Sequence, residues 1–399
     1  MTAAKSIADR GAKAVLVERS ESLGGMAREL TCKGLVECRN CGACFAVDRA
    51  DEVLRSPLVE VLLLSEVASV GRTDEGYVAK VKVAPRYVTD DCIGCSKCAD
   101  VCPVDGKAIH PPKGTGLPRT HWIDRKRCLH FKKAGCTKCA EVCPTKAVDF
   151  GDRARNVTRK ASSVVYATGM DPVDACEVAR LGCGTLNDVM SSVDAERMLN
   201  EAGRLTRPSD GAAPKAIAVI QCVGSRSVKD GTDYCSKFCC KYSTKISQLI
   251  IDADPETRLD FYFMDLRTLH EPQDEFKTWA KDRKKTVRLI RSMPAAVLQG
   301  KGGKLVVRAS TETDTEVQEN EYDLVLLSVG MRPHGAATPL AGSLGIATDE
   351  RGFAKASVEL ASKGVHVVGA VSEPMDIEET AVRTVSALTK VKFTKEGAR

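Results

Sequence analysis

Long apolar runs, aromatic side chains and histidines are scarce in this 399-residue sequence. Aromatic residues make up 5% of the chain, and there are six histidines. No stretch approaches the ~18 consecutive apolar residues that a bilayer-crossing helix needs, and the first residues lack the charged-then-apolar pattern of a secretion signal. The basic residues are scattered, without a block of like charge or interleaved aromatics. We therefore expect a cytoplasmic protein with no membrane span and no nucleic-acid partner.

Cysteine, in contrast, is abundant, with 18 residues. Without a secretion signal, this number indicates reduced thiols and metal ligation, not a disulfide scaffold. The formal net charge of +6 is provisional, because a [4Fe–4S]²⁺ core held by four thiolates carries about −2, and four such clusters would bring the total to about −2. An apolar fraction of 43% is enough for real cores, and the length has room for two or three domains.

The strongest motif lies between residues 89 and 151, where C-x2-C-x2-C-x3-C-P occurs twice, the second time with five extra residues after its first cysteine. In two-cluster ferredoxins the fourth cysteine of each run ligates the other cluster. One predicted [4Fe–4S] ligand set is therefore Cys92, Cys95, Cys98 and Cys143. The other predicted set is Cys128, Cys136, Cys139 and Cys102. Zinc is disfavoured, because it takes paired C-x2-C knuckles. Three nearby histidines are expected to be solvated loop residues: His110, His121 and His130.

The first residues read as part of a Rossmann unit. A helix is predicted over Thr2–Arg10 and a buried strand over Ala14–Val17, followed by Glu18 in the position that binds the adenosine ribose. The first strand and the G-x-G-x-x-G loop that holds the pyrophosphate should precede this helix. We therefore expect that Met1 is an internal methionine, from a misplaced start or a fragment; an unrelated strand–helix start is the alternative.

Three later signals agree with an FAD domain. A glycine pair follows Glu18, an apolar strand ends in A-T-G, and a C-terminal strand ends in a glycine shortly before a new helix. The N-terminus of that helix would direct its positive end toward the flavin N1/C2 carbonyl. The predicted FAD-binding residues are Glu18, Gly24, Gly25, Ala167, Thr168, Gly169, Gly369, Asp376 and Ile377.

A second dinucleotide-type domain opens with a strand at 214–220 and closes with a strand at 322–330. The loop after its opening strand, Gln221–Arg226, keeps one glycine, so pyrophosphate cannot approach in the usual way and NAD(P)H binding is disfavoured. Four cysteines follow the pattern C-x12-C-x3-C-C, and a third [4Fe–4S] cluster is predicted on Cys222, Cys235, Cys239 and Cys240. A redox-active disulfide between Cys235 and Cys239, or inert thiols, are the alternatives. Arg226 is expected either to raise the potential of a nearby cluster or to form a structural salt bridge.

Another cysteine loop, C-x5-C-x2-C-x2-C, follows the glycine pair. A fourth [4Fe–4S] cluster is predicted on Cys32, Cys38, Cys41 and Cys44. Zinc and a flavin-coupled disulfide between Cys32 and Cys38 remain open alternatives. The last two cysteines, Cys176 and Cys183, have no partners at a useful spacing and are predicted to be small buried hydrophobes.

The runs Q-C-V-G-S-R and Y-C-S-K-F-C-C, at 221–226 and 234–240, resemble the A subunit of heterodisulfide reductase. The resemblance covers nearly the whole chain. It implies FAD, a cluster on the four cysteines of the second domain, and membership of a multi-subunit complex with ferredoxin- or hydrogenase-type electron partners. In some members it implies flavin-based bifurcation, and a homodimer within the complex is compatible with it. Ser227 departs from the family, where an aspartate usually follows the arginine. The first Gly-rich loop and the extra C-terminal ferredoxin modules of larger relatives are also lacking.

The expected fold is α/β, with two Rossmann-like domains of the disulfide-reductase type and an inserted two-cluster ferredoxin. Residues 1–88, 152–213 and 331–399 are predicted to form the FAD domain, 89–151 the insertion and 214–330 the second domain. The expected function is an oxidoreductase subunit that exchanges single electrons between clusters and a two-electron flavin, with no side chain acting as nucleophile or general base. The alternatives are a self-sufficient NAD(P)H-dependent enzyme resembling the glutamate synthase small subunit, and a relay scaffold without FAD.

Overall fold

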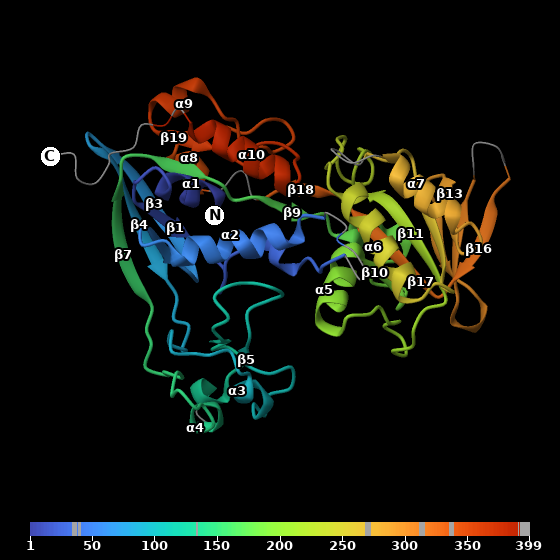
Figure 1. Ribbon diagram of the computed structural model, residues 1–399, viewed down its shortest axis with the longest axis horizontal. Coiled ribbons are helices and arrows are strands. Elements are labelled where there is room, and N and C mark those ends of the chain that lie inside the picture. The colour runs from blue at the N-terminus through green and yellow to red at the C-terminus, as the bar shows by residue number, and fades with distance from the viewer. Residues whose placement is uncertain are drawn as a thin grey trace.

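The computed structural model describes residues 1–33, 38, 41–132, 135–267, 273–310, 316–334, 339–389 and 391. It consists of two α/β lobes, with a smaller cysteine-rich unit beside the first lobe (Figure 1). The lobes are joined by an antiparallel ribbon in which β9 (Met170–Pro172) pairs with β18 (Met331–Pro333). In the described part of the chain, no helix combines the length and apolar composition that crossing a membrane requires.

The first lobe contains two separate two-stranded parallel sheets. One pairs β1 (Ala14–Val17) with β2 (Val59–Leu62), and the other pairs β8 (Val164–Tyr166) with β19 (Val365–Val367). Ala14 of one sheet and Val165 of the other pack into the same apolar cluster, so the two sheets lie next to each other without pairing.

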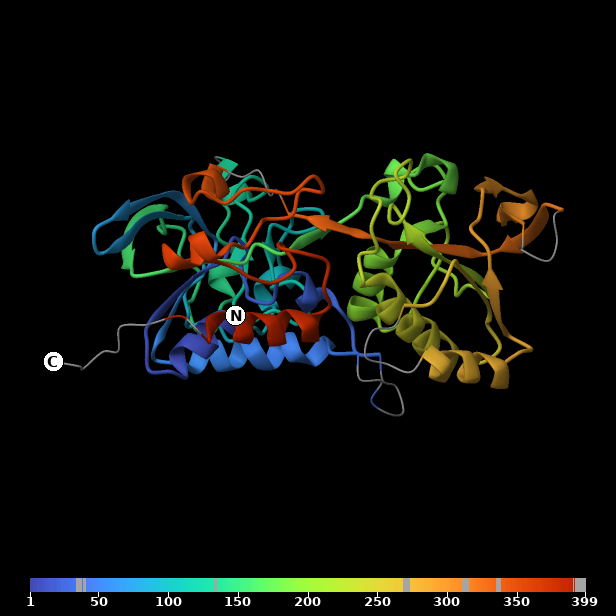
Figure 2. The same ribbon diagram turned by 90° about the horizontal axis from the view of Figure 1, so that it is seen from above.

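Helices and an antiparallel sheet complete this lobe. α1 (Thr2–Ala8) packs against both α2 (Ala43–Arg55) and α10 (Ile377–Leu388), on one side of the lobe (Figure 2). The lobe also contains two short helices, α8 (Pro339–Ser343) and α9 (Val358–Ser362), and one 3-10 turn, η1 (Gly25–Glu29). The antiparallel sheet has the order β3 (Ser65–Thr73), β4 (Gly76–Val83), β7 (Arg155–Ala161).

The cysteine-rich insertion leaves the first lobe after β4 and returns through β7. Its regular elements are short: α3 (Lys97–Asp100), β5 (Ile109–His110), β6 (Trp122–Ile123), η2 (Leu129–Lys132) and α4 (Lys138–Glu141). Its small core consists of residues such as Tyr87, Ile109 and Ile123 together with buried cysteines. Cysteine side chains are therefore part of the packing of this unit.

The second lobe is built on one continuous parallel sheet. Its order is β10 (Val189–Ser191), β17 (Leu324–Val329), β11 (Ala216–Val223), β12 (Arg258–Phe263), β13 (Val287–Arg291). Three helices accompany it: α5 (Ser192–Ala202), α6 (Cys239–Ala253) and α7 (Gln273–Asp282). An antiparallel sheet follows, with β14 (Ala296–Gln299), β15 (Leu305–Ala309) and β16 (Gln318–Tyr322). The remaining 3-10 turns are η3 (Ala175–Glu177), η4 (Ala179–Leu181) and η5 (Lys301–Gly303).

The predicted boundary at residue 214 lies too late in the chain. β10 pairs with β17 of the second lobe, and α5 continues directly from β10. The short strand β10 could not be recognised before the sheet it joins was known, because three residues carry no periodicity. The α/β class itself, with Rossmann-type lobes, is as predicted.

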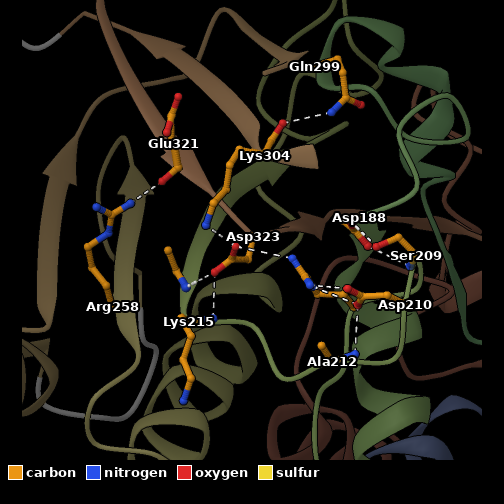
Figure 3. Close-up of polar contacts among 12 residues, drawn as sticks. Asp188, Ser209, Asp210, Ala212, Lys215, Arg258, Gln299, Lys304, Glu321 and Asp323 are labelled. Carbon is orange, nitrogen blue, oxygen red and sulfur yellow. Dashed lines mark hydrogen bonds and ion pairs between the residues drawn. The ribbon is translucent and has the colours of Figure 1, made fainter. Parts of the chain in front are cut away.

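Asp323 fixes the amino-terminal edge of the second lobe (Figure 3). Its carboxylate accepts hydrogen bonds from the backbone N–H groups of Lys215 and Ala216, both at 2.9 Å, and from Lys304 Nζ at 2.5 Å. Burial acts to raise the pKa of Asp323, but the hydrogen bonds outweigh it and the pKa is lowered. This network therefore joins the starts of β11 and β17, at the edge opposite to the cysteines.

Candidate functional site

Two hollows in the insertion are each lined by four cysteines. One, of about 340 Å³, is lined by Cys92, Cys95, Cys98 and Cys143. The other, of about 330 Å³, is lined by Cys102, Cys128, Cys136 and Cys139. The structure thus brings together the same two groups that the sequence spacing predicted, with the fourth cysteine of each run crossing to the other group. We call them the proximal and the distal hollow, respectively, by their order outward from the first lobe.

The environment of these thiols suits iron ligation. Burial, with the nearby Cys92, raises the pKa of Cys98 to about 11, and burial, with the nearby Cys128, raises that of Cys139 to about 12. Such groups become thiolates only when a metal replaces the proton. The backbone N–H groups of Ala108 and Ala147 donate to the sulfurs of Cys102 and Cys143, each at 3.3 Å. Hydrogen bonds to sulfur are among the means by which proteins set cluster potentials.

The proximal hollow lies on the side of the insertion that contacts the first lobe. Thr115 N–H donates to the Arg28 carbonyl, and Leu23 N–H donates to the Leu117 carbonyl, both at 2.8 Å. Leu23 directly precedes the predicted flavin-binding glycine pair. The same loop of the insertion continues to His121, which lines the proximal hollow. The order from the first lobe outward is therefore the proximal and then the distal hollow.

The prediction that His121 is a solvated loop residue is wrong. Its side chain is 1% exposed, and its ring nitrogens lie 3.8 Å from Cys92 Sγ and 3.2 Å from Ser96 Oγ. Burial lowers its pKa, as does the nearby Arg119. His130 is half-buried and stacks on Phe150 at a centroid distance of 3.7 Å. These loops carry no periodic pattern of apolar residues from which burial could be inferred.

The third cysteine group stands at the carboxyl edge of the second lobe. Cys222 is near the end of β11, and Cys239 and Cys240 open α6. These three thiols are at least 95% buried and hydrogen-bond to one another through Cys239, which raises the pKa of Cys239 and lowers that of Cys240 to about 7. Cys235 is half-buried, Arg226 interacts electrostatically with both Cys235 and Cys222, and the Cys235 sulfur accepts from Lys237 N–H at 3.4 Å.

The backbone around this group is in unusual conformations. Cys222, Arg226 and Lys237 all have positive φ, between 57° and 61°, a region that side chains other than glycine, Asn and Asp seldom occupy. Arg226 forms an ion pair with Asp265, so the predicted structural role is present, and its charge also acts on the Cys222 thiol. Backbone strain of this kind is concentrated at functional sites, where surrounding structure maintains it.

The third cysteine group faces the start of α10 in the first lobe. Lys237 Nζ lies 3.5 Å from Glu379, and Lys241 Nζ lies 3.6 Å from Asp376 and 3.5 Å from Glu378. Both lysines belong to the segment that carries Cys235, Cys239 and Cys240. The predicted third cluster site and the predicted flavin-facing helix are thus joined by ion pairs across the two lobes.

The predicted flavin residues gather at one edge of the first lobe. Glu18 follows β1, Ala167 to Gly169 follow β8, and Gly369 follows β19 by two residues. Arg19 contacts His334 at 3.3 Å, and His334 N–H donates to the Gly169 carbonyl at 3.3 Å, which links the two halves of this edge.

Two further predicted elements belong to the same site. Asp376 is the N-cap of α10 and accepts from Glu379 N–H at 2.7 Å, with Ile377 as the first helical residue. Gly24 and Gly25 have φ of 115° and 53°, and a Cβ at Gly24 would come within 2.8 Å of Arg28 Cβ. The glycine pair was predicted to allow close approach of the cofactor, whereas in this structure the residue that approaches Gly24 closely is Arg28.

The N-terminal cysteine loop is only partly described. Cys32, Cys38 and Cys44 are exposed, Cys41 is half-buried, and Cys44 lies in the first turn of α2. Residues 34–37, 39 and 40 lie outside the described residues, so this ligand set stays a prediction. The loop is anchored at Lys33, whose Nζ lies 2.6 Å from Glu196 of α5 in a pair that is almost fully buried. Burial raises the pKa of Glu196 despite the adjacent Lys33. Sequence reasoning missed this pair, because 163 residues separate its members.

The prediction for Cys176 and Cys183 is wrong. They form a disulfide with a Cα–Cα distance of 4.7 Å, and Cys176 is exposed. Cys176 lies within η3, and η4 lies between the two cysteines. These two 3-10 turns reverse the chain, so that residues seven apart in the sequence can be joined. Asp174 caps η3 and lies within 4.8 Å of both sulfurs.

The fold and these sites define an α/β protein with two Rossmann-type lobes and an inserted unit of the two-cluster ferredoxin type. Residues 91–147 match the family of 4Fe-4S dicluster domains. This match confirms the prediction that the insertion is of the two-cluster ferredoxin type. Among solved structures, a thioredoxin reductase from T. acidophilum aligns with 97% of this chain and 90% of its own, at 14% identity and a TM-score of 0.49.

Proteins whose sequences match this chain include iron–sulfur A subunits of CoB–CoM heterodisulfide reductase. The chain is 33% identical to the second such protein of Methanopyrus kandleri, over 97% of this chain and 61% of that protein. It is 31% identical to the corresponding protein of Methanocaldococcus jannaschii, over 98% of this chain and 62% of that protein. The predicted resemblance is therefore confirmed: the chain is related to the A subunit of heterodisulfide reductase over nearly its whole length. It spans about three fifths of the length of these relatives.

Proposed function

We propose that this chain is the FAD- and iron–sulfur-containing electron-transfer subunit of a cytoplasmic complex related to heterodisulfide reductase. When bound, the clusters supply one-electron steps and the flavin supplies a two-electron store. The observation that carries the proposal is the arrangement of three cysteine groups around the predicted flavin edge. The insertion that carries the two hollows contacts Leu23 through Leu117 on one side, and the third cysteine group adjoins the N-terminus of α10 on the other.

The residues of this chain would perform four tasks. The cysteines hold iron: four in each hollow and Cys222, Cys235, Cys239 and Cys240 in the second lobe. Ala108 and Ala147 donate backbone hydrogen bonds to the sulfurs of the proposed ligands Cys102 and Cys143. Lys237 and Lys241 hold the third group against α10. The core packing around Cys239 keeps water away from that group. Cys32, Cys38, Cys41 and Cys44 complete the proposal as a fourth ligand set.

A self-sufficient NAD(P)H-dependent enzyme is the second candidate, and the second lobe argues against it. The loop that would hold the pyrophosphate is filled by protein: a Cβ at Gly224 would lie 2.3 Å from Val173 Cγ1, and one at Gly330 would lie 2.6 Å from Ser225 Cβ. The buried Cys222 occupies the mouth of this loop. Backbone packed so closely leaves no open cradle for a phosphate.

The decisive experiment measures iron, zinc and flavin in anaerobically purified protein and then tests electron donors. We expect about 16 Fe per chain if all four groups hold clusters, or about 12 if the N-terminal loop does not. We also expect flavin reduction by a low-potential one-electron donor such as reduced ferredoxin, and none by NADH or NADPH. Protein with less than about 8 Fe per chain, or with flavin bleached by NADPH without a partner, would contradict the proposal.

Flavin-based bifurcation is the stronger form of this proposal. It requires that the two electrons of the flavin leave to acceptors of different potential. Three cysteine groups that approach the flavin edge from two directions provide two separate exits. Redox titration of the flavin in the assembled complex tests this form, because bifurcation requires half-potentials in inverted order and a simple relay does not.

A further inference from the structure

The charges of the insertion are unevenly distributed along its sequence. From residue 102 to 143, the sequence has nine basic residues and three acidic ones. The two flanking segments, 89–101 and 144–151, together have two basic residues and four acidic ones, Asp90, Asp91, Asp100 and Asp149. Basic residues are scattered along the whole chain, but within the insertion they are concentrated in the central segment 102–143.

Five of these basic residues lie around the distal hollow. Lys138 lines that hollow, Lys107 Nζ donates to the Cys102 carbonyl at 3.3 Å, and Arg127 donates to the Asp105 carbonyl next to that loop. Lys126 and Lys132 flank the same segment. These five side chains, which we call the distal basic face, are all exposed.

The distal basic face is not neutralised by its own protein. Within the described part of the insertion, none of its five cations forms an ion pair with a carboxylate, whereas many arginines of the second lobe do, such as Arg180 with Asp230 and Arg288 with Asp260. α4, which begins at Lys138, lies at the free end of the insertion, away from both lobes (Figure 1). Unpaired cations at the free end of a unit with two cluster sites create a field that acts on approaching molecules.

We propose that the distal basic face is the docking surface for an acidic one-electron carrier protein, such as a ferredoxin, which exchanges electrons with the distal cluster. The inference rests on the proposed function and adds the place of entry and the order of transfer: carrier, distal group, proximal group, flavin. The cations attract an acidic partner, and they bring it next to the cluster ligands Cys102 and Cys136. Electrostatic complementarity of this kind acts mainly on association rate.

The test compares two triple variants with the same change in net charge. Lys126→Glu, Lys132→Glu and Lys138→Glu reverse part of the distal basic face. Lys281→Glu, Lys284→Glu and Lys285→Glu reverse three exposed lysines of the second lobe and serve as the matched control. Binding of an acidic [2Fe–2S] ferredoxin is measured by calorimetry with both proteins oxidised, so that no electron transfer contributes. Electron transfer from the reduced ferredoxin is then measured by stopped flow at several salt concentrations.

We expect the distal variant to lose affinity and association rate by about 10- to 100-fold at low ionic strength and to lose most of the salt dependence. The control should change by less than about twofold. Equal behaviour of the two variants would overturn the docking surface, as would tighter binding of a duplex oligonucleotide than of ferredoxin to this face. If wild-type protein binds ferredoxin in this way but transfers no electrons to its flavin, the docking surface stands and the proposed function fails. Iron content and cluster potential of both variants show whether the substitutions altered the clusters themselves.

Discussion

The insertion and the second lobe both present four-cysteine groups, but they support them differently. In the insertion, cysteines such as Cys98 and Cys128 are members of a small core that includes few large apolar side chains. In the second lobe, Cys239 and Cys240 are buried members of a large cluster that includes residues of β11, β12, β17 and three helices. The comparison indicates that metal ligation supplies much of the folding free energy of the insertion, whereas the second lobe folds on its sheet and then holds its cysteines.

The largest expected effect is therefore on the insertion. Cys139→Ala should remove about four Fe and also loosen the whole insertion, because a small unit that loses a metal loses folding free energy directly. Hydrogen exchange of residues 89–151 measures this, and we expect protection there to fall by about tenfold or more while that of β11 and β17 is unchanged. Retained protection in the insertion of this variant would contradict the comparison.

A matched substitution in the second lobe should separate iron from folding. Cys239→Ala should also remove about four Fe, but with a loss of only about 1 kcal/mol in the free energy of unfolding, which corresponds to a few degrees in Tm. The reason is that the buried methyl group keeps most of its packing within the cluster around Ile246 and Phe261. Iron analysis with thermal unfolding checks this. Loss of the fold of the second lobe in the Cys239→Ala variant would show that its cysteines are as structural as those of the insertion.

The hydrogen bonds of Asp323 are one interaction that stabilises the second lobe without metal, and substitution of Asp323 tests this role. Asp323→Asn should lower the free energy of unfolding by about 2 kcal/mol at neutral pH, because a charged hydrogen-bond acceptor for two backbone N–H groups and Lys304 is weakened. The pKa of Asp323 is lowered from 3.8 in the folded state. Its contribution is thus complete above the unfolded value and is lost as the pH falls through the lower folded value.

The measurement uses cluster-free protein, so that acid-labile iron plays no part. Trp279 reports on the second lobe, and Trp122→Phe removes the other tryptophan. The difference between wild type and Asp323→Asn should be constant from about pH 7 to about pH 5 and shrink below about pH 4. A difference that grows on acidification would mean that the Asp323 carboxyl is protonated in the folded state.

Local spacing in the sequence predicted far more than distant contacts. The motif of the ferredoxin insertion determined which four cysteines meet, because each ligand set is defined by runs of a few residues. The bounds of the strand Ala14–Val17 and the start of α10 at Asp376 also agree with expectation. The predicted burial of that strand is wrong, because its residues are half-buried and Val15 is exposed. The pair of Lys33 with Glu196 and the contacts of Lys241 with Asp376 were not foreseen, because they depend on how the lobes pack, and no local pattern encodes that.

Cys176 and Cys183 illustrate the same limit and give the most local predicted effect. Their disulfide closes a short loop at the surface of the second lobe, and a loop of this length contributes roughly 2 kcal/mol in the chain-entropy description. The double variant Cys176→Ser with Cys183→Ser should increase hydrogen exchange near η3 and η4 and leave iron content unchanged. Alkylation of the iron-free, denatured wild-type protein under argon should leave these two of the 18 cysteines unmodified. Modification of all 18 would show that the pair exists as thiols in the cell. Asp174 and the two sulfurs would then form a small exposed cluster. In that case the second lobe would lack any covalent cross-link within its described residues.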